Sequence, residues 1–228
     1  MNIPVVIPVY NSPYIDEVIQ DVERLGYHLI VVDDGSDTPV ISHLDHVCVL
    51  RHKENMGKGE AILSGAKKAK ALGYEAFVIF DGDKQHLSSE ISKLLKAYKE
   101  GSIVIGNRDF SVENVPKSSK FGRKFSNFWV FLETFKRLGD TQSGLRIYPT
   151  SILDLHVKNK RFDFEIEVLA LHSYRGGSII DVDVACYYPP QEERISHFDK
   201  VQDNIRLTKA HTKLMLQRYL LLRGLLWE

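Results

Sequence analysis

Two aspartates, Asp81 and Asp83, follow the apolar run AFVIF and are separated by Gly82. Glycine allows a sharp backbone turn at a strand end, so both carboxylates can face one site. Adjacent carboxylates repel each other unless a cation neutralises them, and hard cations such as Mg²⁺ or Mn²⁺ prefer oxygen ligands. The pair therefore suggests a metal site that holds a diphosphate. Taken alone, the tripeptide favours a plainer interpretation, a turn at Asp81 and a helix cap at Asp83.

Polar side chains also follow other apolar runs of the chain. Asn11 follows IPVVIPVY, Asp33 and Asp34 follow LIVV, and the pair Asn107 and Arg108 follows IVIG. Ligands of open α/β sheets bind beyond the carboxyl ends of the strands. We therefore expect these residues to meet at one edge of a sheet, together with the aspartate pair.

The elements that must position these residues alternate between short β-branched runs and amphipathic helical patterns, among them 57–72 and 88–99. This alternation predicts an α/β fold with a mainly parallel central sheet and helices on both faces. Beyond about residue 109 follow a basic, aromatic helical stretch, the turn DTQSGLR, a helix near 163–174, a strand near 178–186 and a C-terminal helix. No linker interrupts the chain, so we expect a single domain over residues 1–228.

The composition limits the classes of partner. The 228 residues are 43% apolar, enough for a sizeable core, and their formal net charge of zero gives no global field for nucleic acid. Cys48 and Cys186 lie in apolar runs, which favours buried thiols over a disulfide or metal site. No stretch reaches the roughly 18 apolar residues of a membrane span, and no signal peptide is evident. We therefore expect a cytoplasmic protein.

Six motifs in a fixed order raise the metal interpretation above the plainer one. They are IPVVIPVYNS, VVDDGS, NMGKGEAI, FDGDKQH, GNR and DTQSGLR. Together they resemble the family 2 glycosyltransferases of the GT-A fold, most of all the branch of dolichyl-phosphate mannose synthases and polyprenyl-phosphate glycosyltransferases. The resemblance covers nearly the whole chain. It implies a Rossmann-like sheet, a half at 1–108 that binds a nucleoside-diphosphate sugar, and a half at 109–228 that binds the acceptor.

The resemblance implies a nucleoside pocket lined by Pro8 and Tyr10, with Asp33 or Asp34 bonding the base or ribose. Carboxylates suit these N–H and hydroxyl donors, although Asp34 fits a turn role equally well. Lys58 lies in a GKG segment before a helix and could meet phosphate, although close packing of the small residues is the safer interpretation. The expected donor contacts are Pro8, Tyr10, Asn11, Asp33, Asp34, Lys58, Asp81 and Gly82.

The segment DGDKQH matches the usual DADGQH of the family. The match implies metal or metal-shell roles for Asp81, Asp83 and Gln85, with Mg²⁺ or Mn²⁺ as the cofactor. Lys84 replaces a common glycine and could contact phosphate or point to solvent. His86 could lie near the donor sugar or pack as a structural histidine.

The acceptor motifs leave two alternatives. Arg108 matches a family G-x-R whose arginine faces a phosphate, and DTQSGLR resembles D-x-x-S-G-[FL]-R, for which a surface turn is the plainer interpretation. In EERISHFDK, His197 replaces the lysine of the branch, which weakens the case for a lipid phosphate. YYPPQEERISHF also resembles relatives from lipid-modification gene clusters. The expected acceptor contacts are Arg108, Ser143, Arg146, Arg194, Ser196 and His197.

These motifs predict a metal-dependent, inverting transfer of a sugar from a UDP- or GDP-sugar to a membrane lipid, most of all a polyprenyl phosphate. A lipid hydroxyl as acceptor is the alternative, and it would require a base, for which Asp140 is the candidate. A non-catalytic nucleotide-sugar-binding protein is an alternative of a different class. The expected catalytic residues are Asp81, Asp83, Asp140 and Arg108.

The stretch KSSKFGRKFSNFWVFLETFKRLG carries aromatic residues at near-helical spacing among lysines and arginines. Such a helix can lie in an anionic bilayer surface, so we expect peripheral contact with the cytoplasmic face of a membrane. The C-terminal helical pattern could pack on this helix, contact lipid, or form a homodimer or partner-domain interface.

Overall fold

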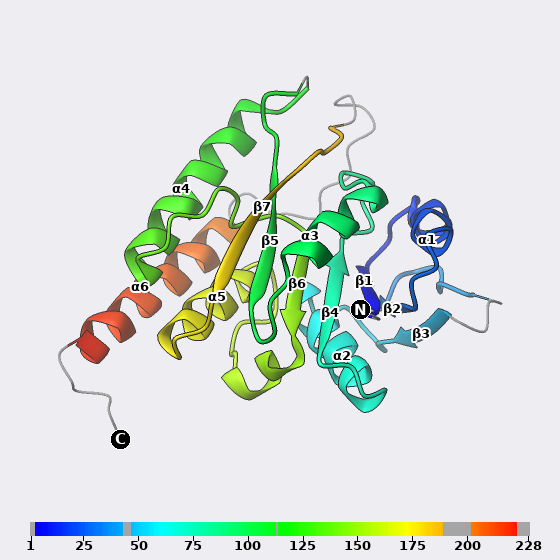
Figure 1. Cartoon of the computed structure of the whole chain (residues 1–228), viewed down its shortest axis with the longest axis horizontal. Helices are drawn as coiled ribbons and strands as arrows, with labels where there is room; N and C mark the ends of the chain where they lie inside the picture. Colours follow the sequence, from blue (N-terminus) through cyan, green and yellow to red (C-terminus); the bar gives the residue numbers. More distant parts are fainter. Residues whose placement is uncertain (1–2, 43–46, 113, 189–201, 223–228) are drawn as a thin grey trace.

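A sheet of seven strands forms the centre of the protein (Figure 1). The structure is a computed structural model that describes residues 3–42, 47–112, 114–188 and 202–222. The strand order is β3-β2-β1-β4-β6-β5-β7, with β6 antiparallel to β4 and β5 and all other neighbours parallel. The strands are β1 (Val5–Val9), β2 (Leu29–Asp33), β3 (Val47–Arg51), β4 (Ala76–Phe80), β5 (Ile103–Arg108), β6 (Leu145–Pro149) and β7 (Ile179–Val184).

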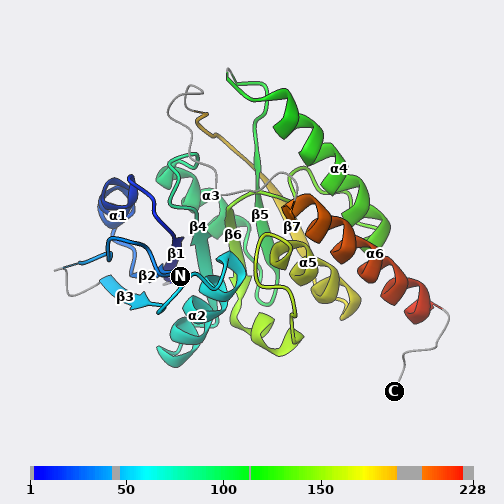
Figure 2. The same cartoon turned by 180° about the vertical axis from the view of Figure 1, so that it is seen from behind.

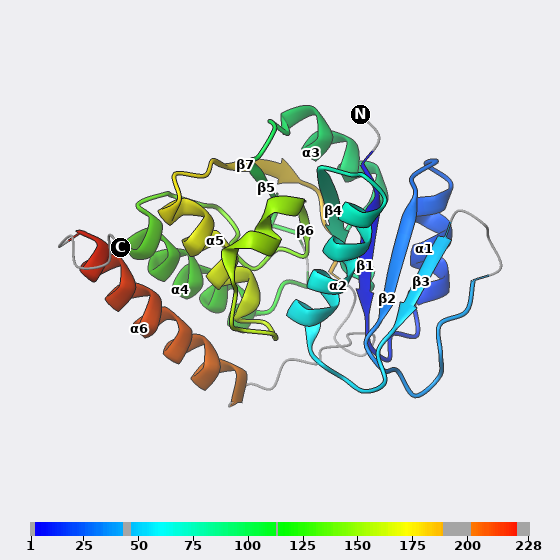
Figure 3. The same cartoon turned by 90° about the horizontal axis from the view of Figure 1, so that it is seen from below.

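Alternate side chains of the sheet enter two separate cores. Figure 3 shows that helices cover the sheet from both faces. Val6 and Ile30 join the core under α2 (Lys58–Ala71) and α5 (Phe164–Tyr174). Val5, Ile7 and Val31 join the core under α1 (Ile15–Glu23) and α3 (Ile91–Ala97). The expected mainly parallel sheet with helices on both faces is thereby confirmed. Two short 3₁₀ helices, η1 (Ser88–Glu90) and η2 (Thr150–Leu155), complete the order.

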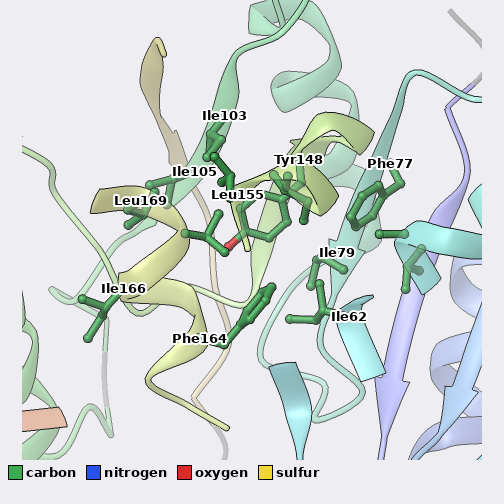
Figure 4. Close-up of a cluster of buried hydrophobic side chains, with 14 of the residues drawn as sticks. Ile62, Phe77, Ile79, Ile103, Ile105, Tyr148, Leu155, Phe164, Ile166 and Leu169 are labelled. Carbon is green, nitrogen blue, oxygen red and sulfur yellow. The ribbon is translucent and has the colours of Figure 1, made fainter. Parts of the chain in front are cut away.

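Small residues bring α2 close to the sheet. A methyl group at Gly65 would lie 2.3 Å from Cγ1 of Val6, and one at Gly59 would lie 2.5 Å from Cβ of Phe164. Figure 4 shows Phe164 with Ile62 and Ile79 in the core between α2, α5 and the sheet. The expected close packing of the small residues is therefore confirmed.

Strand β6 is the element that the sequence does not predict. Leu145–Pro149 begins within DTQSGLR, where we expected only a turn, and all five residues are buried. Arg146 and Pro149 interrupt the apolar pattern that normally identifies a central strand. Because β6 pairs with β4 and β5, a strand from the second half of the chain completes the sheet of the first half.

Helix α4 (Lys117–Thr134) and helix α6 (Gln202–Leu222) pack together with α5 at one side of the sheet (Figure 2). A buried pair joins α4 to α6, because Nδ1 of His211 lies 2.7 Å from Oε1 of Glu133. Packing on α4, one of the roles considered for the C-terminal helix, is confirmed, and a dimer stays a prediction. Among the described residues, no helix has the length and apolar character that a membrane crossing requires.

Candidate functional site

A cleft of about 550 Å³ lies beyond the carboxyl ends of β1 and β4. It collects six of the eight expected donor contacts from separate segments, and Asp83 lies among them. Two residues of the loop before α5, Arg161 and Phe162, also reach it and were not expected; the basic run KNKRF is the sequence signal that marks them. The lining residues are Pro8, Val9, Tyr10, Ser12, Asp34, Asn55, Gly57, Lys58, Ala61, Asp81, Gly82, Asp83, Gln85, Arg161 and Phe162.

Asp81 follows the last residue of β4 and lines this cleft. Its Oδ2 accepts a hydrogen bond of 2.8 Å from Nζ of Lys58, whereas its buried Oδ1 has no hydrogen-bond partner among the described residues. Gly144 lies directly behind, because a methyl group there would be 1.9 Å from Oδ2 of Asp81. Burial raises the pKa of Asp81 to about 6; the Lys58 ammonium opposes this, and the Asp83 carboxylate adds to it. The charge of Asp81 is therefore incompletely balanced.

The turn after Asp81 does not use Gly82 as we expected. The φ angle of Gly82 is not left-handed, and the nearest atom to an added methyl group is 3.7 Å away. The left-handed residue is Lys84, with φ of 62°, at the position where the family commonly has glycine. Its ammonium pairs with Glu17 and lies over the Tyr14 ring, away from the cleft lining. Of the two roles considered for Lys84, the geometry therefore favours a side chain directed away from the cleft over a phosphate contact.

Asp83 and Gln85 line the cleft together with Asp81. Oδ1 of Asp83 accepts the backbone N–H of Gln85 at 3.0 Å, and Oε1 of Gln85 accepts a bond of 3.3 Å from Arg108. The first bond is a local turn contact and not the helix cap of the plainer interpretation, because the next helical turn begins at Ser88 without a side-chain cap. This bond leaves Oδ2 of Asp83 available. Both residues remain part of the cleft wall.

Glu165 is a further site residue that the sequence analysis missed. It lies in the first turn of α5 and is 5% exposed, with Oε1 3.1 Å from Nζ of Lys58 and Oε2 3.6 Å from Nη2 of Arg146. Burial alone would lower the Lys58 pKa, but the Asp81 and Glu165 carboxylates raise it above its ordinary value. Lys58 is therefore a charged link between Asp81 and α5.

The two aspartates of VVDDGS have different positions. Asp33 is completely buried outside the cleft, where it accepts the Ser36 N–H at 2.9 Å and pairs with Arg51. These contacts hold the loop after β2 and do not support the expected donor contact of Asp33. Asp34 lines the cleft and accepts the N–H groups of Met56 at 2.9 Å and Gly57 at 2.8 Å. Its donor contact stays a prediction.

Asn11 also lies outside the cleft lining. Its side chain joins two loops, because Nδ2 donates to Oδ2 of Asp37 at 3.0 Å and Oδ1 accepts the N–H of Asp37 at 2.8 Å. The geometry therefore supports a role in shaping the cleft rim rather than the expected direct donor contact.

Arg108 and Asp140 form a bidentate ion pair beside the cleft. Nε of Arg108 lies 2.6 Å from Oδ2 of Asp140, and Nη2 lies 3.2 Å from Oδ1. Burial alone would lower the Arg108 pKa, but the Asp140 carboxylate outweighs this effect, so the pKa lies above its ordinary value. The side chain of Asp140 is 0% exposed, so it does not face a position where a hydroxyl could bind. This arrangement disfavours Asp140 as a general base.

Two other residues of DTQSGLR, Ser143 and Arg146, are buried and do not face the cleft. Arg146 is 0% exposed and donates to the carbonyls of Ser143 at 2.6 Å and Thr141 at 2.7 Å. Ser143 is equally buried. The expected direct acceptor contacts of Ser143 and Arg146 do not fit this burial, and the surface-turn interpretation is wrong as well. Arg194, Ser196 and His197 lie outside the described residues.

The residues of the cleft fit a divalent cation. In the part of the chain that the structure describes, no group of three His, Cys, Asp or Glu side chains forms a complete metal site. Mg²⁺ is usually held by one or two carboxylates together with substrate phosphates and waters. Asp81, with its unpartnered Oδ1, and Asp83 could supply the carboxylates, and Gln85 could supply an amide oxygen.

His86 lies in the interior and not in the cleft lining. It is 5% exposed and contacts the Phe80 ring edge to face at a centroid distance of 6.2 Å. Burial lowers the His86 pKa well below its ordinary value, and the Arg108 and Lys58 cations add to this. The packed structural histidine is therefore the interpretation that the geometry supports.

The sheet order, the two helical layers and the cleft at the strand ends define a GT-A fold. Solved structures of glucosyl-3-phosphoglycerate synthase from Mycobacterium tuberculosis share it. The complex with uridine diphosphate has a TM-score of 0.64 at 20% identity, covering 95% of this chain and 79% of that chain. The complex with Mn²⁺, UDP-glucose and phosphoglyceric acid has a TM-score of 0.65 at 19% identity, with the same coverage.

The chain belongs to glycosyl transferase family 2, whose family model matches residues 5–158. It is 29% identical to the UDP-N-acetylglucosamine–dolichyl-phosphate N-acetylglucosaminyltransferase of Methanococcus voltae, over 80% of this chain and 84% of that protein. It is 30% identical to an uncharacterized protein of Methanocaldococcus jannaschii, over 81% of each. It is 29% identical to the polyprenol monophosphomannose synthase of Mycolicibacterium smegmatis, over 79% of this chain and 75% of that protein. The expected family and branch are confirmed, and the protein is a glycosyltransferase.

Proposed function

We propose that the protein transfers a sugar from a UDP- or GDP-sugar to a polyprenyl phosphate, with Mg²⁺ or Mn²⁺ as cofactor and inversion at the anomeric carbon. The unpartnered Oδ1 of Asp81, held in the cleft beside Asp83 and Lys58, carries this proposal. A divalent cation there would neutralise the charge that develops on the departing diphosphate. The relatives named for transfer to dolichyl or polyprenol phosphate, and the similar fold solved with Mn²⁺ and UDP-glucose, give further support.

The cleft offers groups for each part of such a donor. Pro8 and Tyr10 provide an apolar and aromatic wall for the nucleoside, and Asp34 is the nearby acceptor for ribose or base donors. Lys58 and Arg161 are the cations of the lining, and they suit the diphosphate. A nucleoside diphosphate would therefore place its phosphates toward Asp81 and its nucleoside toward β1.

The Arg108–Asp140 pair supports a phosphate acceptor over a hydroxyl. An oxygen of a lipid phosphate is already anionic, so it can attack the anomeric carbon while the electron pair of the broken bond remains on the diphosphate. No proton moves in this step, and no base is required. A hydroxyl acceptor would require a base, and the buried carboxylate of Asp140 is bound to Arg108 instead. Arg108 would position the acceptor phosphate at the edge of the cleft.

Helix α4 suits access to a membrane lipid. Phe121 and Phe128 are 72% and 56% exposed, and the lysines at 117, 120 and 124 are exposed beside them. The sole acidic residue in the sequence of α4, Glu133, is buried. An aromatic and basic surface favours anionic lipid headgroups, so we propose that the protein binds the cytoplasmic face of a membrane through α4.

The test is a donor and acceptor panel. The protein is incubated with UDP- and GDP-sugars, with Mn²⁺, Mg²⁺ or chelator, and with polyprenyl phosphate, the matching polyprenol or no lipid. We expect release of nucleoside diphosphate that depends on metal and polyprenyl phosphate together, and Asp81→Asn should reduce it by about 100-fold or more. Equal turnover with polyprenol would contradict the phosphate acceptor. Equal turnover without lipid would indicate a hydrolase, and failure to bind any nucleotide sugar would refute the proposal.

A further inference from the structure

Glu165 is a buried acid that connects the second half of the chain to the cleft. Its Oε1 lies 3.1 Å from Nζ of Lys58, and Nζ is also 2.8 Å from Oδ2 of Asp81. The side chains of Lys58 and Asp81 are 16% and 22% exposed, so both reach the cleft, whereas that of Glu165 is 7% exposed. Glu165 is absent from the cleft lining. Its contact with the cleft lining is therefore through Lys58.

An ammonium that contacts two carboxylates competes differently with a metal ion from an ammonium that contacts one. If Lys58 had Asp81 as its single anionic partner, it would compete directly with a divalent cation for that carboxylate. With Glu165 in contact, the ammonium keeps a counter-charge when Asp81 turns its charge toward a metal. Such interactions are strong in a partly desolvated site, because water screens them poorly.

We propose that Glu165 is a positioning residue that holds the Lys58 ammonium and thereby keeps Asp81 available to the divalent cation. This inference rests on the proposed function, because it takes Asp81 as a metal ligand. The two oxygens of Asp81 then have separate roles. Oδ2 contacts Lys58, and the unpartnered Oδ1 is left for the cation.

The proposal predicts opposite changes in Mn²⁺ affinity for two substitutions. Glu165→Gln removes the counter-charge, so Lys58 should hold Asp81 more strongly and Mn²⁺ should bind more weakly. Lys58→Met removes the competing cation, so Mn²⁺ should bind the donor-free protein more tightly. Because Glu165 contacts the cleft through Lys58, Glu165→Gln should have little effect in the Lys58→Met background.

The experiment is a Mn²⁺ titration of the full chain without donor, with free Mn²⁺ measured by electron paramagnetic resonance. We expect Glu165→Gln to raise the Kd about tenfold, and to raise it less than about twofold in the Lys58→Met background, as for residues coupled in one charge network. The matched control is Glu167→Gln on the same helix. Glu167 is as well buried as Glu165, with 3% exposure. Its Oε2 accepts the backbone N–H groups of Lys158 and Asn159, at 3.0 and 2.7 Å, and so has different partners from Glu165.

The outcomes separate this inference from the proposed function. An unchanged Kd in Glu165→Gln, or the same weakening in both backgrounds, would overturn the positioning role. A wild-type protein that binds no Mn²⁺, even with UDP present, would instead overturn the metal-dependent function. Circular dichroism checks folding, and if Glu165→Gln does not fold, Glu165→Asp withdraws the carboxylate from Lys58 with its charge retained. That variant should also bind Mn²⁺ more weakly, and an unchanged Kd would again overturn the role.

Discussion

The glycine of DTQSGLR has a steric role at the scale of single residues. A methyl group at Gly144 would lie 1.9 Å from Oδ2 of Asp81, so the Asp81 carboxylate occupies the place of a side chain. Gly144→Ala should displace this carboxylate and reduce turnover by about 100-fold, the loss expected from a misplacement of about 1 Å in an active site. Steady-state kinetics on the folded variant measures the loss.

A control for this change lies in α4. A methyl group at Gly122 would meet nothing closer than 3.8 Å, and this helical position favours alanine. Gly122→Ala should therefore keep wild-type turnover. Wild-type turnover in Gly144→Ala would mean that the contact with Asp81 is not required.

His86 predicts a pH dependence of stability. Burial and neighbouring cations lower the His86 pKa well below the ordinary 6.5, so the unfolded chain binds a proton that the folded protein excludes. Stability from this residue is complete above pH 6.5 and decreases as the pH falls below it, by about 1.4 kcal/mol per unit. Urea unfolding measures the free energy of unfolding at pH 7.5 and at pH 5.5. The decrease in this free energy between the two pH values should be about 1 kcal/mol smaller in His86→Gln than in wild type. An equal loss in both proteins would contradict neutral burial of His86.

At the scale of elements, α4 presents a surface that the proposed membrane contact requires. Lys120→Glu with Lys124→Glu reverses two exposed charges beside the Phe121 ring. Each basic residue near an anionic surface contributes about 1 kcal/mol, so the double change should weaken binding at least about 30-fold. Sedimentation with phosphatidylserine-containing vesicles measures the partition coefficient.

The matched control reverses two lysines elsewhere on the surface. Lys70 in α2 and Lys99 after α3 are exposed, and reversing both gives the same change of net charge. If this pair weakens vesicle binding as much as the α4 pair, net charge rather than α4 would determine membrane contact.

The sequence predicts those elements whose pattern is local. The apolar runs identify the strands around β1 and β4, and the end of β4 correctly places Asp81 at a cleft. Strand β6 is missed because the charge of Arg146 is satisfied by backbone carbonyls that lie near it only in the folded chain. Glu165 is missed because α5 is buried on all sides of its first turns, so no periodic pattern separates a functional acid from its neighbours.

At the scale of the whole molecule, the central sheet and several ion pairs join the two expected halves of the chain. Strand β6, from the second half, lies between β4 and β5 of the first half. Three ion pairs among the described residues also cross the boundary: Lys58 with Glu165, Glu60 with Lys160, and Arg108 with Asp140. The first half therefore lacks a central strand of its own sheet. We predict one cooperative domain over the whole chain, although the sequence motifs divide into donor and acceptor halves.

Unfolding experiments test this prediction with two probes. Circular dichroism follows the whole chain. The chain has two tryptophans, Trp129 in α4 and Trp227, so the fluorescence of a Trp227→Phe variant reports on Trp129 alone. The two urea transitions should coincide, as in two-state unfolding, and UDP with Mn²⁺ at about 100 times Kd should stabilise both by about 2.7 kcal/mol. A fragment of residues 1–108 should not fold, because β4 and β5 would lack the strand that pairs between them. A cooperative transition in this fragment, or a ligand shift seen by one probe alone, would show that the halves are separate domains.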